Sequence, residues 1–448
     1  MAPRSCSRRV AAAAVAVCMG ISMVACSDDS GSTSDSGSTA TTAAAVTSDA
    51  PSSSTATSDG GPVTDPPSAG EVDGFAWRGP ATGEPIVLGM VNTEGTPGLD
   101  FPEMRTDTDA AVEYLNAHGG MGGRPVQIEH CTVNGSPEAS QSCAQELAGK
   151  GVDMVLLGLD LFPGYDSYAA SGLPVVGALP ILPGDYTADA LFVTGGNLTT
   201  MAAMVALAVE HYDAKTAGII SADNPGANGS EASLTAALDK AGITYTSIKG
   251  GDNETDAGFQ GLVRQATADN PDVLFSLYSD AGCIGSMRAR ASMAISTPAI
   301  TTAICASAEV LDVVGDDALG WSFVGVGSGG GTTASDEFDE IVSSVHGEDG
   351  STSIGLGALG INMVMTLARV ANHLADAGSA VDGAAVYDAL KTSTDLLAFP
   401  NDNPLACGLV AAYPSVCAFE FPIGEYVASG EVQTVPGFDA VSVVDYLP

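Results

Sequence analysis

Hydrophobic and polar positions in the first folded part of the chain follow a repeating order of strands and helices. Ile86–Val91 and Val152–Leu157 are nearly all apolar, which is typical of parallel strands buried on both faces. Between them, Asp109–Ala117 has apolar residues at helical spacing, Arg124–His130 alternates like a half-covered strand, and Ser136–Gly149 follows as a helix capped by Ser136. Strand, helix and strand in this order imply right-handed crossovers and an open, doubly wound sheet.

The same order returns later in the chain. A helix is expected at Asn197–Tyr212, with Asn197 or Thr199 as its cap. The strands expected after it are Thr216–Ser221, Thr244–Ile248, Val273–Leu277, Ala299–Thr302 and Leu319–Val324, and the helices among them are Ser230–Ala241, Ala257–Ala268 and Met287–Ala291. Helices Ser335–His346, Ser353–Ala377 and Val381–Thr392 follow, and then a hairpin of Ala418–Tyr426 and Glu431–Val435. A chain of 448 residues with this pattern is expected to form two α/β lobes.

The N-terminus predicts export. Three arginines within the first nine residues precede the apolar run Val10–Ala25, which has the features of a secretory signal peptide, residues 1–25. Cys26 follows small residues and resembles the cysteine of a bacterial lipobox, although Met23 stands where that pattern prefers leucine. We therefore predict lipidation of Cys26 and an anchor on the outer face of the cell membrane. The alternative is a plain secreted protein cut nearby.

Residues 26–84 are rich in Ser, Thr, Ala, Gly, Asp and Pro, with hardly a large apolar residue before Phe75. Such a segment buries too little surface to fold, so we expect a disordered tether between the lipid anchor and a body that begins near Pro85.

The charge balance restricts the partners. The chain has 15 basic and 54 acidic residues, a net charge of −39. This balance argues against nucleic-acid binding and against adsorption of the folded body to anionic lipid, because both require clustered basic residues. A highly soluble surface explains the acidity; an acidic field that concentrates cationic ligands is the alternative.

Six cysteines remain beyond Cys26, an even number that suggests disulfides in an exported chain. Pairing between sequence neighbours, namely Cys131–Cys143, Cys283–Cys305 and Cys407–Cys417, is the simplest of the 15 connectivities possible for six cysteines. Zinc binding is the alternative, but no C-x-x-C occurs and the five histidines are scattered, so we expect no metal.

No motif supports catalysis or a cofactor. Gly325–Gly330 fits G-x-G-x-x-G, but it follows a late strand within a glycine and serine run, so we interpret it as an interlobe turn. Neither G-x-S-x-G nor H-E-x-x-H is present, and we expect the protein not to be an enzyme. Ser353–Ala377 is interrupted by polar residues, which favours a core helix over a membrane span.

A family resemblance is visible in Ala111–Val126, which reads A-x-E-Y-L-N-A-x-G-G-M-G-G-R-P-V, followed by a cysteine-bearing loop and Val152–Gly158. This order resembles the first lobe of type I periplasmic binding proteins, and most of all the leucine/isoleucine/valine-binding receptors of ABC transporters. The resemblance covers roughly Glu84 to Pro448 and implies two Rossmann-like lobes joined by three crossings that form a hinge. Lobe one would be residues 85–197 and 326–397, and lobe two residues 198–325 and 398–448.

Ligands of open α/β sheets bind at the carboxyl ends of the strands. The candidate ligand-binding residues are therefore Asn92, Thr93, Glu94, Gly158, Leu159, Asp160, Ala178 and Leu179 in lobe one, and Asp223, Asn224, Tyr278, Asp280 and Thr301 in lobe two. For each of them an ordinary loop or capping role is the alternative.

The resemblance implies that lobe one holds an amino-acid carboxylate with backbone N–H and hydroxyl donors, while an acidic and an aromatic side chain receive the ammonium group. Asp160, Asp223 and Asp280 are the candidates for the amine. However, Leu159-Asp160 and Ala178-Leu179 replace the family's usual serines and threonines, which leaves amino-acid specificity open.

The predicted function is that of an extracytoplasmic substrate-binding lipoprotein of an ABC importer. It would capture a small polar solute, an amino acid or a related compound, by hinge closure, and act as a monomer with permease subunits as partners. The alternative is a ligand-sensing receptor ectodomain without a role in transport.

Overall fold

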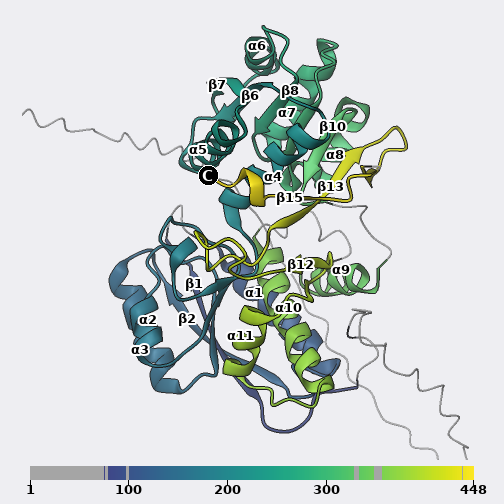
Figure 1. Cartoon of the computed structure of the whole chain (residues 1–448). Coiled ribbons are helices and arrows are strands. Elements are labelled where there is room, and N and C mark those ends of the chain that lie inside the picture. Colours follow the sequence, from purple (N-terminus) through teal and green to yellow (C-terminus); the bar gives the residue numbers. More distant parts are fainter. Residues whose placement is uncertain (1–74, 76–78, 97–99, 327–331, 348–355, 436) are drawn as a thin grey trace, which may run out of the picture. The chain divides into compact units, whose positions relative to one another are not determined.

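The computed structural model describes residues 75, 79–96, 100–326, 332–347, 356–435 and 437–448 (Figure 1). The predicted signal peptide, Cys26, most of the predicted tether, and residues 327–331 of the glycine run lie outside the described residues.

The first sheet forms lobe one. It contains five parallel strands in the order β2-β1-β3-β4-β5. Its strands are β1 (Ile86–Thr93), β2 (Val126–Val133), β3 (Met154–Leu157), β4 (Val175–Gly177) and β5 (Leu191–Phe192). The helices that accompany it are α1 (Pro102–Ala117), α2 (Pro137–Lys150), α3 (Tyr165–Ala170), α9 (Thr333–His346), α10 (Gly357–Asp376) and α11 (Gly383–Thr392).

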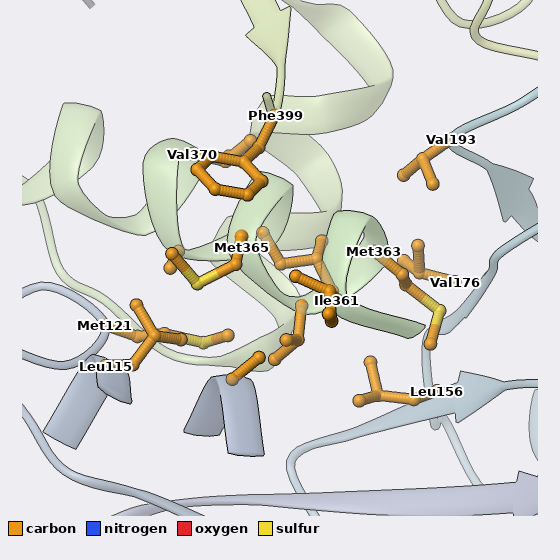
Figure 2. Packing of buried hydrophobic residues seen from close by; sticks show 14 of the residues in the cluster. Leu115, Met121, Leu156, Val176, Val193, Ile361, Met363, Met365, Val370 and Phe399 are labelled. Carbon is orange, nitrogen blue, oxygen red and sulfur yellow. The ribbon is translucent and has the colours of Figure 1, made fainter. Parts of the chain in front are cut away.

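Helix α10 lies in the core of lobe one. Figure 2 shows Ile361, Met363 and Met365 of α10 among side chains of the sheet and of α1, including Leu156 and Leu115, and all of these are buried. The apolar segment expected at Ser353–Ala377 is therefore a core helix, as predicted. No helix in the described part of the chain is long and apolar enough to cross a membrane.

The second sheet forms lobe two and repeats the same strand order. Its parallel part runs β7-β6-β8-β9-β10, and β13, β14 and β15 add antiparallel strands beside β10 (Figure 1). Its strands are β6 (Thr216–Ala222), β7 (Thr244–Gly250), β8 (Val273–Leu277), β9 (Ala299–Thr302), β10 (Trp321–Val324), β13 (Glu420–Tyr426), β14 (Val432–Thr434) and β15 (Ala440–Ser442). The helices are α4 (Gly196–Glu210), α5 (Pro225–Ala241), α6 (Asp256–Ala266), α7 (Asp280–Ser292) and α8 (Ala308–Val314).

Two segments that connect the sheets are hydrogen-bonded to each other. Phe192 in β5 donates its N–H to the carbonyl of Ser415 (2.7 Å) and accepts from the N–H of Cys417 (3.1 Å). The chain continues from β5 into α4, and from Cys417 into β13. Before Cys417, β11 (Leu396–Ala398) and β12 (Asn403–Leu405) form a small antiparallel pair.

All three predicted disulfides are present: Cys131–Cys143, Cys283–Cys305 and Cys407–Cys417. The first joins β2 to α2, the second joins α7 to the segment after β9, and the third closes the connection from β12 to β13. The prediction of local pairing was therefore correct.

Several local expectations need correction. Helix α1 begins at Pro102 rather than Asp109. Its early turns are polar in sequence, but they pack closely on α10: a Cβ at Gly360 would lie 2.6 Å from the carbonyl oxygen of Met104. Phe75 lies in the predicted tether, yet it is buried in the lobe-one core and its N–H donates to the carboxylate of Glu337. The folded part of the chain therefore includes a residue that precedes Pro85.

The predicted cap of α4 is wrong. The helix begins after Gly195, which is its N-cap, and no side chain caps it. Neither Asn197 nor Thr199 takes this role, because both lie within the first turns of the helix.

Close packing of β6 against α6 yields a test of the fold. A Cβ at Gly218 would lie 2.3 Å from the carbonyl oxygen of Ala266, which is backbone and cannot turn aside. We expect Gly218→Ala to lower the free energy of unfolding by about 1–3 kcal/mol, the usual cost of overpacking. Gly261 in α6 has open space around its Cα, so Gly261→Ala should raise the free energy of unfolding by about 0.5–1 kcal/mol. Urea denaturation measures both, and equal midpoints for the two variants would contradict the packing described here.

Candidate ligand-binding site

The switch point of lobe one lies between β1 and β3, where the strand order reverses and open α/β sheets bind ligands. Asn92 joins the two strand ends: its side-chain amide donates to the carbonyl of Phe101 (2.8 Å), and its Oδ1 accepts from the N–H of Leu159 (3.1 Å). Thr93 donates its N–H (2.8 Å) and its hydroxyl (2.5 Å) to the carbonyl of Leu159. Both the N–H and the carbonyl of Leu159 are therefore hydrogen-bonded to groups within the protein.

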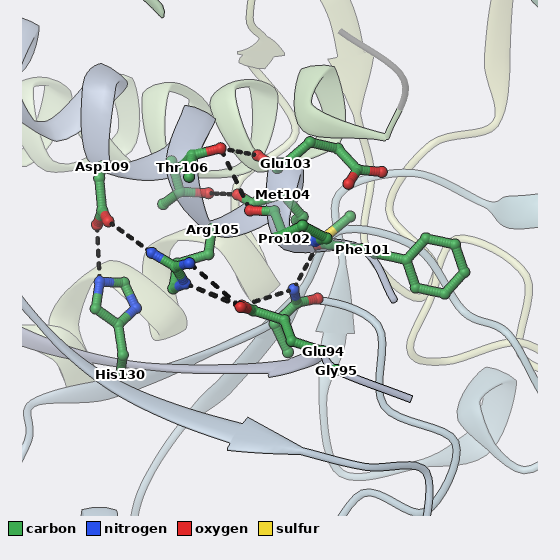
Figure 3. Close-up of polar contacts among 12 residues, drawn as sticks. Glu94, Gly95, Phe101, Pro102, Glu103, Met104, Arg105, Thr106, Asp109 and His130 are labelled. Carbon is green, nitrogen blue, oxygen red and sulfur yellow. Dashed lines mark hydrogen bonds and ion pairs between the residues drawn. The ribbon is translucent and has the colours of Figure 1, made fainter. Parts of the chain in front are cut away.

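Glu94 is neutralised by a neighbour. Nε of Arg105 donates to both carboxylate oxygens (3.0 and 3.2 Å), and a second guanidinium nitrogen donates to one of them (3.2 Å). Figure 3 shows the pair continuing through Asp109 to His130, whose ring nitrogen lies 2.8 Å from the Asp109 carboxylate. The hydrogen bond that Arg105 donates to Glu94 raises the pKa of Arg105. This network holds the start of α1 and leaves Glu94 committed to Arg105.

Gly158 is required by packing. A Cβ at this position would lie 2.8 Å from Oδ1 of Asn92, 2.9 Å from Sδ of Met104 and 3.0 Å from the carbonyl oxygen of Val91. Close approach of α1 and β1 explains the glycine without reference to a ligand.

Asp160 is 1% exposed and lies against α2. Its Oδ1 accepts hydrogen bonds from the hydroxyl of Ser140 (2.6 Å) and the N–H of Phe162 (2.9 Å), whereas its Oδ2 has no partner among the described residues. Burial raises the pKa of the Asp160 carboxyl, and the charge of Asp185 raises it further. The carboxyl is buried, so it is not presented to solvent at the edge of the sheet.

The loop after β4 is apolar. Ala178 is fully buried, and its carbonyl accepts from the hydroxyl (2.7 Å) and the N–H (3.2 Å) of Thr194. Leu179 packs on the lobe-one core. Phe162 and Leu182 in the neighbouring loops are 44% and 40% exposed. Lobe one therefore presents apolar side chains here, and the polar groups traced at its switch point are already paired.

The corresponding edge of lobe two is acidic. Asn224 caps α5, with its Oδ1 accepting from the N–H of Ala227 (2.8 Å), and its amide donates to Asp252 (2.5 Å). Asp223 is 3.4 Å from the amide of Asn228. Glu254 accepts from the N–H of Gly251 (2.8 Å). These acids follow β6 and β7.

Tyr278 follows β8, beside the second switch point. Its side chain is 5% exposed, its ring packs edge-on against Phe259 with centroids 5.2 Å apart, and its hydroxyl has no partner among the described residues. Burial, together with the charges of Glu254 and Asp252, raises the pKa of Tyr278 to about 12. A buried hydroxyl without a partner costs about 1–3 kcal/mol, so its retention favours a functional role.

Asp280 begins α7 with φ +45°, a conformation that non-glycine residues seldom adopt. Thr301 in β9 is fully buried and donates to the carbonyl of Ser276 (3.0 Å). The Cys283–Cys305 bridge joins the first turn of α7 to the segment after Thr301, and therefore holds these two loops together.

A family model described as "Periplasmic binding protein" matches residues 85–404. The chain belongs to the periplasmic binding protein family. Solved structures with similar folds include an ABC transporter substrate-binding protein from Sphaerobacter thermophilus (19% identity, 81% of this chain and 100% of that one, TM-score 0.60). A substrate-binding protein of an ABC transporter from Aeropyrum pernix (15%, 82% and 99%, 0.56) and a leucine-binding protein from Thermotoga maritima (13%, 80% and 99%, 0.52) are also similar. At these sequence identities the similarity to the solved structures shows only that the fold is shared. The search of curated proteins found no match to the chain.

The resemblance to type I periplasmic binding proteins is thus confirmed, as is the two-lobed α/β fold. The family consists of extracytoplasmic solute-binding proteins that work with ABC permeases, not of enzymes. In the described part of the chain, no three His, Cys, Asp or Glu side chains are grouped so that they could hold a metal ion.

In this periplasmic binding protein, the predicted residues differ in what they offer a ligand. Asn92, Thr93, Gly158 and Leu159 form one tightly bonded group, whereas Ala178 and Thr301 are fully buried. Asp252 and Glu254 were not among the ligand-binding residues predicted from the sequence. They follow β7, the strand next to β6, so their position at a strand end is the signal that was available.

The buried Asp160 predicts a pH effect on stability. In the folded protein the pKa of the Asp160 carboxyl lies above the usual value of 3.8. The protonated carboxyl therefore contributes its full stabilisation of the folded state below pH 3.8, and this contribution is lost as the pH rises through the raised pKa. Asp160→Asn keeps an oxygen for Ser140 and Phe162 and removes the charge. We expect this variant to gain stability over the wild type with rising pH, by about 1.4 kcal/mol for each unit of the shift. Chemical denaturation from pH 4 to 8 measures the difference. The exposed Asp166→Asn is the control, and parallel profiles for wild type and Asp160→Asn would contradict the prediction.

Proposed function

We propose that this periplasmic binding protein captures a small solute that carries an amine and delivers it to an ABC permease. The observation that supports an amine is the unpartnered, buried hydroxyl of Tyr278 beside the charges of Asp252 and Glu254. A protonated amine bound here would reduce both unfavourable effects. It would donate a hydrogen bond to the hydroxyl oxygen of Tyr278, and its positive charge would offset the repulsion among the carboxylates.

The charges of the two strand edges favour lobe two as the amine site. In lobe one, Glu94 is paired with Arg105 and Asp160 is buried against Ser140. In lobe two, Asp252 and Glu254 act on Tyr278, Asp223 and Asp280 follow the strands β6 and β8, and the nearby Lys249 pairs with Glu231 (3.2 Å). Of the three earlier candidates for the amine, Asp223 and Asp280 therefore remain, and Asp252 and Glu254 join them.

The proposed mechanism is closure about the hinge segments that include Phe192 and Cys417. Lobe one (85–197 and 326–397) would offer the apolar surface around Leu159 and Leu179, and lobe two (198–325 and 398–448) the acidic edge. A ligand that contacts both lobes favours the closed state by its differential affinity, and the permease recognises that state. We further propose a monomer held at the outer face of the membrane by lipidated Cys26 and a tether that begins there.

A screen of the full chain against amino acids, amines, polyamines, amides and carboxylates tests this function. A specific solute at 100 times its dissociation constant should add about 2.7 kcal/mol to the free energy of unfolding. We expect amines to shift the melting temperature and Asp252→Asn to weaken their binding by about tenfold or more. Asparagine can still accept from Asn224, so the fold should be retained.

Asp239→Asn is the matched control, because the exposed Asp239 lies near the opposite end of α5 from Asn224. It removes the same charge and should leave amine affinity unchanged. Equal losses of amine affinity in Asp252→Asn and Asp239→Asn would show that the change in net charge alone causes the weaker binding. A shift with neutral or anionic solutes only would contradict the amine assignment, and turnover of the bound compound would contradict a binding protein.

A further inference from the structure

The loops that follow β3 and β4 in lobe one share an apolar pattern. They read L-D-L-F-P-G at residues 159–164 and L-P-I-L-P-G at residues 179–184. Each begins with a leucine that packs on the lobe-one core, and each exposes the large apolar residue before its Pro-Gly, Phe162 in the first loop and Leu182 in the second. Because β3 and β4 are neighbours in the sheet, both loops lie at the edge where open α/β sheets bind ligands.

Two buried acids turn the polar groups of these loops inward. Asp160 accepts a hydrogen bond from the N–H of Phe162 (2.9 Å), and Asp185 accepts one from the N–H of Leu182 (2.8 Å). Asp185 also accepts from the hydroxyl of Tyr165 (2.8 Å). Since Tyr165 follows the first loop and Asp185 follows the second, this bond joins the two loops. The apolar side chains therefore remain on the outside of a connected pair of loops.

Leu159, Phe162, Leu179 and Leu182 define what we call the apolar loop surface. It begins at Leu159, whose N–H is bonded to Asn92 at the switch point, so it is continuous with the ligand edge of lobe one. Exposed apolar side chains that gather on adjoining loops indicate a contact surface, here in a chain with 54 acidic residues.

The hydrogen-bond donors traced beside this surface are already paired. The N–H of Leu159 donates to Asn92 (3.1 Å), the hydroxyl of Thr93 donates to the carbonyl of Leu159 (2.5 Å), and Arg105 donates to Glu94 (3.0 Å). A carboxylate is bound through such donors, and it would have to break one of these bonds to gain its own.

The start of α4 offers a carboxylate no better site. The N–H of Leu198 donates to the hydroxyl of Tyr186 (3.4 Å). The hydroxyl of Thr199 has no partner among the described residues, but it is fully buried, and its oxygen lies 1.7 Å from the position that a Cβ at Gly195 would take. This hydroxyl therefore packs against Gly195 and is not presented to a solute.

Acidic groups beneath the apolar loop surface also disfavour a carboxylate. Asp160 and Asp185 are 1% and 4% exposed, and they bond the backbone of the two loops from the inside. A negative charge on the solute would be repelled by acids at close range and by the net charge of −39 at longer range, whereas an ammonium group is attracted by that charge.

We propose that the solute is an apolar amine without a carboxylate, whose ammonium binds at the acidic edge of lobe two and whose apolar group binds on the apolar loop surface. The inference rests on the proposed function and narrows its solute class: alkyl or aryl amines are selected and amino acids are rejected. Contact with Phe162 and Leu182 removes apolar area of both solute and protein from water, which favours binding.

Titration calorimetry of the full chain with matched solutes tests this selection. In a series from methylamine to hexylamine, we expect the affinity to rise about threefold to fourfold for each added methylene until the surface is covered. Phenethylamine and 3-methylbutylamine are compared with phenylalanine and leucine, which add only a carboxylate. We expect each amine to bind about tenfold or more tightly than its amino acid, because the carboxylate loses its hydration without gaining free donors.

Phe162→Ser and Leu182→Ser test the surface directly. Both side chains are exposed, so the fold should be retained. Each variant should weaken hexylamine binding by about fivefold to tenfold and leave methylamine binding unchanged, because a methyl group buries little area. Val345→Ser is the matched control: Val345 is 40% exposed, as Leu182 is, but it lies in α9, and its variant should bind both amines as the wild type does.

Three results would overturn the inference: equal affinities for phenethylamine and phenylalanine, an alkylamine series without a rise, or losses in Phe162→Ser and Leu182→Ser no larger than in Val345→Ser. Unchanged hexylamine affinity in Phe162→Ser together with a loss of uptake in cells would assign the loops to the permease, and would overturn it as well.

Methylamine separates this inference from the proposed function, because it carries the amine with almost no apolar group. If methylamine binds with dependence on Asp252 but neither chain length nor a carboxylate changes the affinity, the amine site stands and the selection of apolar amines is overturned. If no amine of any length binds, the proposed function itself falls and the selection falls with it.

Discussion

Polar groups at the carboxyl ends of parallel strands must find a partner in the protein, in water or in a ligand, and this requirement shapes both lobes. In lobe one the requirement is met internally at most of these positions: Asn92 and Thr93 bond the backbone of Leu159, and Arg105 binds Glu94, whereas Oδ2 of the buried Asp160 has no partner among the described residues. Strand order places these groups together, because β1 and β3 are neighbours at the switch point. Asn92, Thr93 and Glu94 are therefore already hydrogen-bonded within the protein.

Lobe two has the same strand order, but the polar groups at its strand ends are paired less completely. Asp223, Asp252, Glu254 and Asp280 gather after its strands, and Tyr278 keeps a buried hydroxyl without a partner. The Cys283–Cys305 bridge joins α7 to the segment after β9, and both sulfurs lie 3.4 Å from the carbonyl oxygen of Tyr278. Like charges lower stability in the free protein, and a bound cation that donates to the hydroxyl oxygen of Tyr278 would offset their repulsion. The two lobes thus share a strand order but differ in the charge at their strand ends, and the proposed amine site belongs to the acidic edge of lobe two.

The start of α4 contains another unpaired buried group. The N–H of Leu198 donates to the hydroxyl of Tyr186 (3.4 Å), whereas the buried hydroxyl of Thr199 has no partner among the described residues. Unpaired buried groups are retained at a cost in stability, which is typical of functional sites.

The sequence by itself determined the elements, their order and the family. Apolar runs, helical spacing and glycine turns are local signals, and the three disulfides join cysteines that are neighbours among the cysteines of the chain. Tertiary structure alone decided which candidate residues are free. Glu94 looked like a ligand contact until the start of α1 brought Arg105 to it, and Asp160 looked accessible until α2 covered it with Ser140. Thr199 looked like a cap, but it lies inside the helix with its hydroxyl against Gly195. The reason is physical: a residue's chemistry is local, whereas the partners that use it come from elsewhere in the chain.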